Sequence, residues 1–162
     1  MSPTTPRPVE QSLVEMTEIV LPEDANSHGS IFGGRVLALV DKCAAIVAMR
    51  HTRSLVLTAS VDSVAFLNPV RVGHVLVLKG RLNAVFGSSM EAEVQVFAED
   101  PLSGQRNMTT RAFVTMVAVG AGGAPRTAPP LAPATDAERE RAIRAVERRQ
   151  TRLALRDASG NL

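Results

Sequence analysis

A carboxylate inside an apolar stretch is the first feature of the sequence that points to chemistry. Asp41 lies between Arg35 and Met49, and its neighbours at helical spacing include Leu37 and Ala44. Burying a lone carboxylate costs free energy. The side chain therefore reaches solvent, pairs with an arginine elsewhere, or belongs to a site in which a carboxylate acts as general base toward water. Position in the sequence alone leaves these interpretations open.

Two adjacent glycines suggest a place for negative charge. Gly33 and Gly34 stand where the apolar stretch begins. Glycines let a ligand approach the first amides of a helix, and the helix dipole favours negative charge there. An oxyanion site has this requirement, although a tight turn made for packing is the alternative. Asn26 and His28 lie just upstream, where a turn or capping role competes with a catalytic one.

The remaining reactive residue types predict neither a metal site nor a thiol nucleophile. Cys43 is the single cysteine, lies in the apolar stretch, and is expected to be a small core residue. The three histidines are scattered without the spacing of a zinc site. The sequence has no phosphate loop and no dinucleotide fingerprint. We therefore expect no metal and no cofactor.

The elements that would position these residues follow from the hydrophobic pattern. The stretch from about Gly33 to His51 is too long for one strand and rich in Leu and Ala, so it predicts a helix. It is apolar nearly all round, which is typical of a buried helix. A strand is expected before it, and four strands after it, at Ser12–Leu21, Leu55–Leu67, Val75–Phe86, Met90–Ala98 and Thr109–Val119. One helix wrapped by an antiparallel sheet of about five strands is an α+β arrangement.

The two ends of the chain differ in composition from the middle. Residues 1–10 are rich in Pro and Thr and are expected to form a disordered leader, followed by a domain over 11–122 and a proline-rich connector over 123–134. A capping box at Thr135 and Glu138 predicts a helix over 135–157, with a short tail at 158–162. This helix carries seven arginines. We expect it to be solvated on one face and to lie on the body of the protein or on a neighbouring subunit, with an anionic partner as the alternative.

Composition narrows the class of protein. The chain has 162 residues, 45% of them hydrophobic, and 18 basic residues nearly balance 16 acidic ones. This balance does not suggest a nucleic-acid partner. The apolar stretch is interrupted by charges and is too short to span a bilayer, and prolines occupy the positions where a signal peptide needs an apolar run. With one cysteine and no possible intrachain disulfide, we expect a cytoplasmic protein.

A series of short motifs runs in order from about Met16 to Pro130. They include Asp24-Ala25-Asn26, Ile31-Phe32-Gly33-Gly34, Asp41, Arg50-His51, Val61-Asp62-Ser63-Val64, Phe66-Leu67-Asn68-Pro69-Val70, Ser88-Ser89-Met90-Glu91 and Phe113-Val114-Thr115. In this combination the chain resembles the hotdog-fold acyl-CoA thioesterases, in particular the short bacterial acyl-CoA hydrolases and the cytosolic brain-type enzymes. The resemblance implies a hotdog fold, and hydrolysis of acyl-CoA to free acid and CoA, with CoA as part of the substrate.

The same resemblance implies an assembly and a set of roles. The smallest active unit would be a back-to-back dimer, commonly a trimer of dimers and hence a hexamer. The site would lie at the dimer interface, with Asn26 from one subunit and Asp41 from the other. Asp41 would activate or position the attacking water, and Asn26 would help to place the water or the thioester. The amides near Gly33 and Gly34 would polarise the thioester carbonyl.

The expected CoA contacts depart from the family at one point. Gly87, Ser88 and Ser89 are the candidate contacts, but Phe86-Gly87 stands where family members commonly have Gly-Arg. The phosphates would then be held from elsewhere, by Arg71 or by a basic residue of the C-terminal helix.

Two other functions fit the same fold. One is a non-catalytic acyl-CoA-binding or regulatory protein, against which the presence of both Asn26 and Asp41 counts. The other is a hotdog dehydratase acting on hydroxyacyl thioesters, which would need a histidine base. His28 is the candidate for that base, but its surroundings in the sequence match the thioesterase motif instead.

Overall fold

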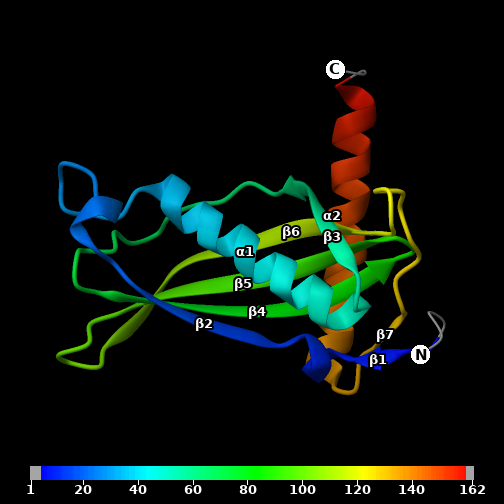
Figure 1. Ribbon diagram of the computed structural model, residues 1–162, viewed down its shortest axis with the longest axis horizontal. Coiled ribbons are helices and arrows are strands. Elements are labelled where there is room, and N and C mark those ends of the chain that lie inside the picture. Colours follow the sequence, from blue (N-terminus) through cyan, green and yellow to red (C-terminus); the bar gives the residue numbers. More distant parts are fainter. Residues whose placement is uncertain (1–4, 160–162) are drawn as a thin grey trace.

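A five-stranded antiparallel sheet curls around one long helix in the computed structural model, which describes residues 5–159 (Figure 1). The strands are β2 (Val14–Ile19), β3 (Leu55–Val61), β4 (Val75–Phe86), β5 (Ser89–Glu99) and β6 (Arg106–Val119). Their order across the sheet is β2-β4-β5-β6-β3, and all neighbours are antiparallel. The enclosed helix is α1 (Gly33–Thr52). The predicted α+β arrangement is confirmed.

The strands form where the sequence alternates. In β5 the apolar side chains of Met90, Ala92 and Val94 are fully buried in the core. Their odd-numbered neighbours Glu91 and Glu93 point to the opposite face, as period-two alternation requires. They are buried as well, with 0% and 4% exposed. Alternation of apolar and acidic residues predicts a strand with one face in solvent, which is wrong for β5 because a second helix covers the outer face of the sheet.

That second helix is α2 (Asp136–Ala158), one residue from the predicted bounds at each end. Its capping box forms as expected: the Glu138 amide donates to Thr135 Oγ1, and the Thr135 amide donates to the Glu138 carboxylate, each at 3.2 Å. In Figure 1 the helix crosses behind the strands and its last turns extend beyond the sheet. Its arginines reach toward the acidic residues of β5, so it lies on the body of the protein.

The helix α1 packs one side against the sheet at short range. A Cβ atom at Gly80 of β4 would lie 2.7 Å from Cys43 Sγ and 2.7 Å from Val47 Cγ2, so the absence of a side chain there lets the helix approach. The other side is not covered, because Leu37 and Met49 remain exposed. The composition of α1 predicts a fully buried helix, but a single chain buries only one of its sides.

The beginning of the chain is part of the packed body. β1 (Arg7–Pro8) pairs in parallel with β7 (Leu131–Ala132), and a 3-10 helix, η1 (Val9–Ser12), follows β1. Arg7 is 8% exposed, and its guanidinium donates to the carbonyl of His51 at the end of α1. The prediction of a disordered leader was wrong for residues 7–10, because Arg7 and Pro8 pair with the connector and the next two residues begin the 3-10 helix. Residues 1–4 of that leader lie outside the described residues.

Three smaller features complete the frame. The strand expected over Leu55–Leu67 ends at Val61, and an irregular segment follows it to residue 74. A second 3-10 helix, η2 (Pro22–Asp24), precedes α1. Within residues 5–159, neither α-helix combines the length and the apolar character needed to cross a bilayer. The expected boundaries at residues 122 and 134 stay predictions.

Candidate active site

Asp41 is held by a hydroxyl group of the neighbouring edge strand. It lies on α1 about two turns after the helix begins, and Thr58 of β3 donates its Oγ1 proton to Asp41 Oδ1 at 2.6 Å. The side chain is half-buried, and it makes no ion pair with residues 5–159. Within residues 5–159 of a single chain, Asp41 is therefore not paired with an arginine, which excludes that interpretation for the monomer. An unpaired carboxylate in this position can accept a proton from water.

Thr58 is a site residue that the sequence did not reveal. It stands 17 positions after Asp41 in a strand whose exposed and apolar residues show no local motif for it. Only the placement of β3 against α1 brings the two side chains together. The sequence predicted a strand here, but a predicted strand does not indicate which of its side chains faces the helix.

The start of α1 offers free backbone amides. The first intrahelical bonds are donated by Arg35 and Val36 to the carbonyl of Phe32, at 3.0 and 3.2 Å. The amides of Gly33 and Gly34 therefore precede the helical ladder, as the first amides of every helix do. A Cβ atom at Gly34 would meet nothing within 4 Å, whereas one at Gly33 would lie 3.1 Å from the ring of Phe66. Gly34 is thus open, and Gly33 packs under an aromatic ring.

A cavity of 350 Å³ lies beside this helix start. Its lining includes Asn26, Gly33, Val36, Phe66 and Val70, so apolar walls surround a few polar groups. Asn26 Oδ1 accepts hydrogen bonds from the amides of His28 and Ser30, at 2.9 and 3.3 Å. Asn26 therefore shapes the loop, while its Nδ2 makes no hydrogen bond to residues 5–159. The structure brings Asn26 and Gly33 to one cavity, and leaves Asp41 outside its lining.

These residues form two half-sites in a single chain. Asp41 is eight residues beyond Gly33, or about 12 Å along the helix axis. The pair of Asp41 and Thr58 lies instead at the free edge of the sheet, where β3 has a neighbour on one side only. Leu55, Leu57 and Val61 of this edge are 69%, 58% and 44% exposed. An apolar unpaired edge strand is a surface that pairs readily with another strand.

The candidate CoA contacts Gly87, Ser88 and Ser89 lie at the end of the sheet where β4 turns into β5. Gly87 and Ser88 form the turn between β4 and β5, and Gly87 takes a positive φ of 74°. Ser89 Oγ accepts a hydrogen bond from Arg149 of α2 at 3.1 Å. Arg71 precedes β4, so it is separated from Gly87 by a strand about 40 Å long. Of the two sources of basic residues considered, only the C-terminal helix reaches this turn within one chain.

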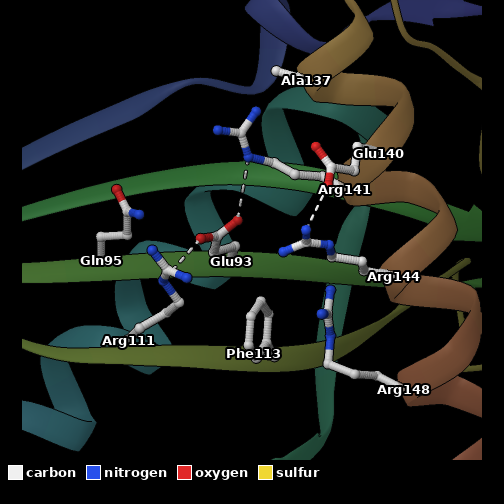
Figure 2. Close-up of a pocket in the computed structure, with 9 residues that line it drawn as sticks. All are labelled: Glu93, Gln95, Arg111, Phe113, Ala137, Glu140, Arg141, Arg144 and Arg148. Atoms are coloured by element: carbon white, nitrogen blue, oxygen red, sulfur yellow. Dashed lines mark hydrogen bonds and ion pairs between the residues drawn. The ribbon is translucent and has the colours of Figure 1, made fainter.

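A network of ion pairs fixes α2 to the sheet. The buried carboxylate of Glu91 accepts from Arg148 at 2.6 Å, from Arg152 at 3.1 Å and from Asn83 at 3.1 Å. Figure 2 shows the neighbouring carboxylate, Glu93, between Arg111 and Arg141. These three residues line a cavity of 230 Å³.

The charges in this cavity are matched. The guanidinium of Arg148 lies 3.8 Å from the ring centroid of Phe113, and Arg144 pairs with Glu140 (Figure 2). Since each carboxylate that lines the cavity has an arginine partner, we assign the cavity to docking of the helix and not to a ligand.

The other candidate nucleophiles and ligands are placed away from the cavity at the helix start. Cys43 is fully buried, and burial raises the pKa of its thiol to about 11, which confirms a core role. His28 is exposed, and His51 is buried against the connector. In the described part of the chain, no three His, Cys, Asp or Glu residues gather in a way that could hold a metal ion.

Comparison with known proteins identifies the family. Residues 28–105 match the model of the thioesterase superfamily. YkhA of Bacillus subtilis, an uncharacterized acyl-CoA thioester hydrolase, is 38% identical over 128 residues, which are 79% of this chain and 74% of that protein. The chain belongs to the thioesterase superfamily. A second member, the cytosolic acyl coenzyme A thioester hydrolase of Mus musculus, is 37% identical over 84% of this chain, which spans 36% of that longer protein.

Solved structures of thioesterases share the fold over nearly the whole chain. A crystal structure of an apo-hexameric acyl-CoA thioesterase has a TM-score of 0.90 and 41% identity, and covers 97% of this chain and 99% of its own. The acyl-CoA hydrolase of Staphylococcus aureus, solved with butyryl coenzyme A, coenzyme A and coenzyme A disulfide, has a TM-score of 0.88 and 33% identity, with coverage of 94% and 93%. The hotdog fold predicted for this superfamily member is confirmed.

Three further structures of the S. aureus hydrolase carry single replacements. In each, one residue has been changed to alanine: an aspartate, a threonine or an asparagine. Their TM-scores against this chain are 0.88, 0.87 and 0.91. The three residue types are those that the structure presents here at Asp41, Thr58 and Asn26.

Proposed function

We propose that this protein is an acyl-CoA thioester hydrolase that cleaves acyl-CoA with water to a free carboxylic acid and CoA. The observation that carries the proposal is the Asp41 carboxylate, which is half-buried, free of cations and oriented by Thr58. A hydrolase needs such a base near an apolar site, whereas a pure binding protein does not. The activity named for the Bacillus and mouse relatives supports the same reaction.

The residues replaced in the S. aureus hydrolase support the choice of site. In that protein the asparagine precedes the aspartate by 15 positions, and the threonine follows the aspartate by 17. Asn26, Asp41 and Thr58 have the same two separations. The agreement favours one functional unit made of these three residues.

The proposed reaction assigns a step to each group. Asp41 accepts a proton from water while the water oxygen attacks the thioester carbonyl carbon. The carbonyl oxygen becomes an oxyanion near the amides of Gly33 and Gly34, at the positive end of α1. The carbon–sulfur bond then breaks, CoA leaves as a thiolate and takes up a proton, and the acid is released. Thr58 donates to Oδ1 of Asp41, which leaves Oδ2 directed to the water, and the amide of Asn26 helps to place the substrate.

The proposed site is completed by a second copy of the chain. Within one chain Asp41 and the cavity at Asn26 are separate, and the β3 edge beside Asp41 is apolar and unpaired. Pairing of two β3 edges about a two-fold axis would cover that edge and give each site residues of both copies. The hexameric thioesterase among the structural neighbours supports self-association, and we propose a dimer that can assemble further to a trimer of dimers. The cytoplasm is the proposed location.

A hotdog dehydratase is the less favoured alternative. That reaction needs a histidine base at the thioester, but the lining of the cavity at Asn26 contains no histidine. His28 is exposed in the loop before α1 and contributes its backbone amide to Asn26. These positions favour hydrolysis.

The test is thiol release from acetyl-, butyryl-, hexanoyl- and palmitoyl-CoA by the wild type and by Asp41→Asn. The replacement keeps the shape of the side chain and removes its basicity, so we expect turnover to fall by about 10²- to 10⁴-fold. Folding and CoA binding should be retained. Asp157→Asn, a change of the same kind at an exposed position of α2, is the matched control and should behave as wild type. Unchanged turnover in a folded Asp41→Asn protein would exclude the general-base role.

A further inference from the structure

Arg149 differs from the other arginines of α2 because it has no acidic partner among residues 5–159. Its neighbours Arg148 and Arg152 pair with Glu91 and Asp62, whereas Arg149 makes no ion pair with residues 5–159. Its guanidinium lies 4.6 Å from the ring centroid of Phe86 and donates one hydrogen bond to Ser89 Oγ. A guanidinium has five N–H donors, so most of its donors stay available. A half-buried, oriented and uncompensated cation of this kind is suited to hold an anion.

The space beside Arg149 is large enough for a ligand. A cavity of 790 Å³ opens between the end of β3 and the C-terminal half of α2. Its lining contains four arginines, namely Arg148, Arg149, Arg152 and Arg156, and one carboxylate, Asp62. Thr115 lines the same cavity, and its Oγ1 is buried without a hydrogen-bond partner in the described chain. Arg148, Arg152 and Arg156 already have acidic partners, so Arg149 supplies the free positive charge of the cavity, which also holds an unused hydroxyl group.

The ion pairs of α2 keep Arg149 pointed at the turn. Arg148 and Arg152 lie four residues apart on one face of the helix, and both bind the buried carboxylate of Glu91. This double contact sets the rotation of α2 about its axis. Arg149 follows Arg148 directly, so its direction is set as well, and the ring of Phe86 supports the flat side of the guanidinium.

We propose that Arg149 binds a phosphate group of the CoA part of the substrate, and that α2 supplies the cation that the β4–β5 turn lacks. This inference rests on the proposed function. Arginine suits the role because its planar donors match phosphate oxygens in pairs. The cavity borders Ala59, Ser60 and Val61, the residues directly after Thr58. A ligand in the cavity would therefore lie within about 10 Å of Thr58 along the strand. The C-terminal helix thereby becomes part of the substrate site.

The test compares Arg149→Gln with the wild type on two butyryl thioesters, butyryl-CoA and butyryl-pantetheine, which has no phosphate. We expect the KM for butyryl-CoA to rise about tenfold or more, as when a charge-assisted hydrogen bond is lost, with kcat within about twofold. The KM for butyryl-pantetheine should not change. Arg144→Gln is the matched control, because Arg144 pairs with Glu140, is 63% exposed and does not line the cavity beside Arg149, and it should leave both substrates unaffected.

Three results would overturn the inference. An equal rise of KM for both thioesters would mean that Arg149 acts through structure, and no change for either would mean that it does not contact substrate. Titration with ADP tests whether Arg149 binds the phosphate of a free nucleotide instead of the phosphate of CoA. If Arg149→Gln binds ADP more weakly but keeps the wild-type KM for butyryl-CoA, the inference is also wrong. If the wild type releases no thiol, the proposed function fails, and calorimetric binding of CoA to both proteins still tests Arg149.

Discussion

His51 illustrates how burial sets the charge of a single side chain. It is fully buried at the end of α1, and its Nε2 lies 2.8 Å from the carbonyl oxygen of Pro129. Burial lowers the pKa of the imidazole below its ordinary value of 6.5, and the charge of Arg7 lowers it further, against the opposing effect of the Pro129 carbonyl. The folded protein therefore holds His51 neutral at a pH where an unfolded chain would bind a proton.

A pH dependence of stability follows from this difference. As the pH falls below 6.5 toward the lower folded pKa, the unfolded state takes up the proton first, so the free energy of unfolding decreases. The slope due to one such group is at most about 1.4 kcal/mol per pH unit. Urea unfolding between pH 7.5 and 5 should show this loss in the wild type and in His28→Gln, an exposed-site control. In His51→Gln the slope should be smaller; an identical slope would contradict the role of His51.

Sequence predicted the candidate site to the extent that its residues lie in local motifs. Asp41, Gly33 and Asn26 stand out because each interrupts or opens a pattern within a few positions. Thr58 and Arg149 do not. Thr58 reaches Asp41 only through the placement of β3, and Arg149 reaches Ser89 from 60 positions away through the docking of α2. Contacts of this range depend on tertiary packing, which no short pattern encodes.

At the scale of elements, the close contact of α1 with β4 is the most sensitive point of the core. Gly80→Ala would place a Cβ atom 2.7 Å from both Cys43 and Val47. Since neither neighbour can move away in a packed core, we expect a loss of about 1–3 kcal/mol in the free energy of unfolding.

Chemical denaturation measures the effect of Gly80→Ala, with Gly34→Ala as the control. A Cβ atom at Gly34 meets nothing within 4 Å, so that variant should unfold at about the wild-type denaturant concentration. Equal midpoints for the two variants would show that the helix does not depend on the close approach at Gly80.

The elements themselves were predictable where hydrophobic periodicity is strong. The long helix, the paired strands β4 and β5 and the capped C-terminal helix follow from pattern and capping residues. The prediction failed where a polar segment finds partners far away. Residues 7 and 8 pair with the connector, and Glu91 and Glu93 look like solvent-facing residues until α2 supplies arginines for them. Such pairings join residues that are distant in sequence.

At the scale of the whole molecule, the free β3 edge predicts the assembly. Leu57→Lys would place a charge on an apolar edge residue that is 58% exposed in the single chain. We expect the monomer to fold, the oligomer to dissociate and thiol release to fall together with it, because the proposed site needs two copies.

Sedimentation and thiol release measured on the same samples would test this prediction. Leu102→Lys is the matched control, since Leu102 is 96% exposed in the β5–β6 turn, and it should leave both properties unchanged. A fully active monomer would show that one chain completes the site alone.

The pairing of Glu91 with α2 also bears on the order of events during synthesis of the chain. Arg148 follows Glu91 by 57 positions, so the ribosome completes every strand of the large sheet before that arginine exists. Until then Glu91 has no arginine partner, whereas Glu93 can already pair with Arg111 of β6. The incomplete chain therefore exposes a carboxylate that the finished protein buries against two guanidinium groups. Docking of α2 removes this carboxylate from the surface, so its accessibility distinguishes an incomplete chain from a complete one.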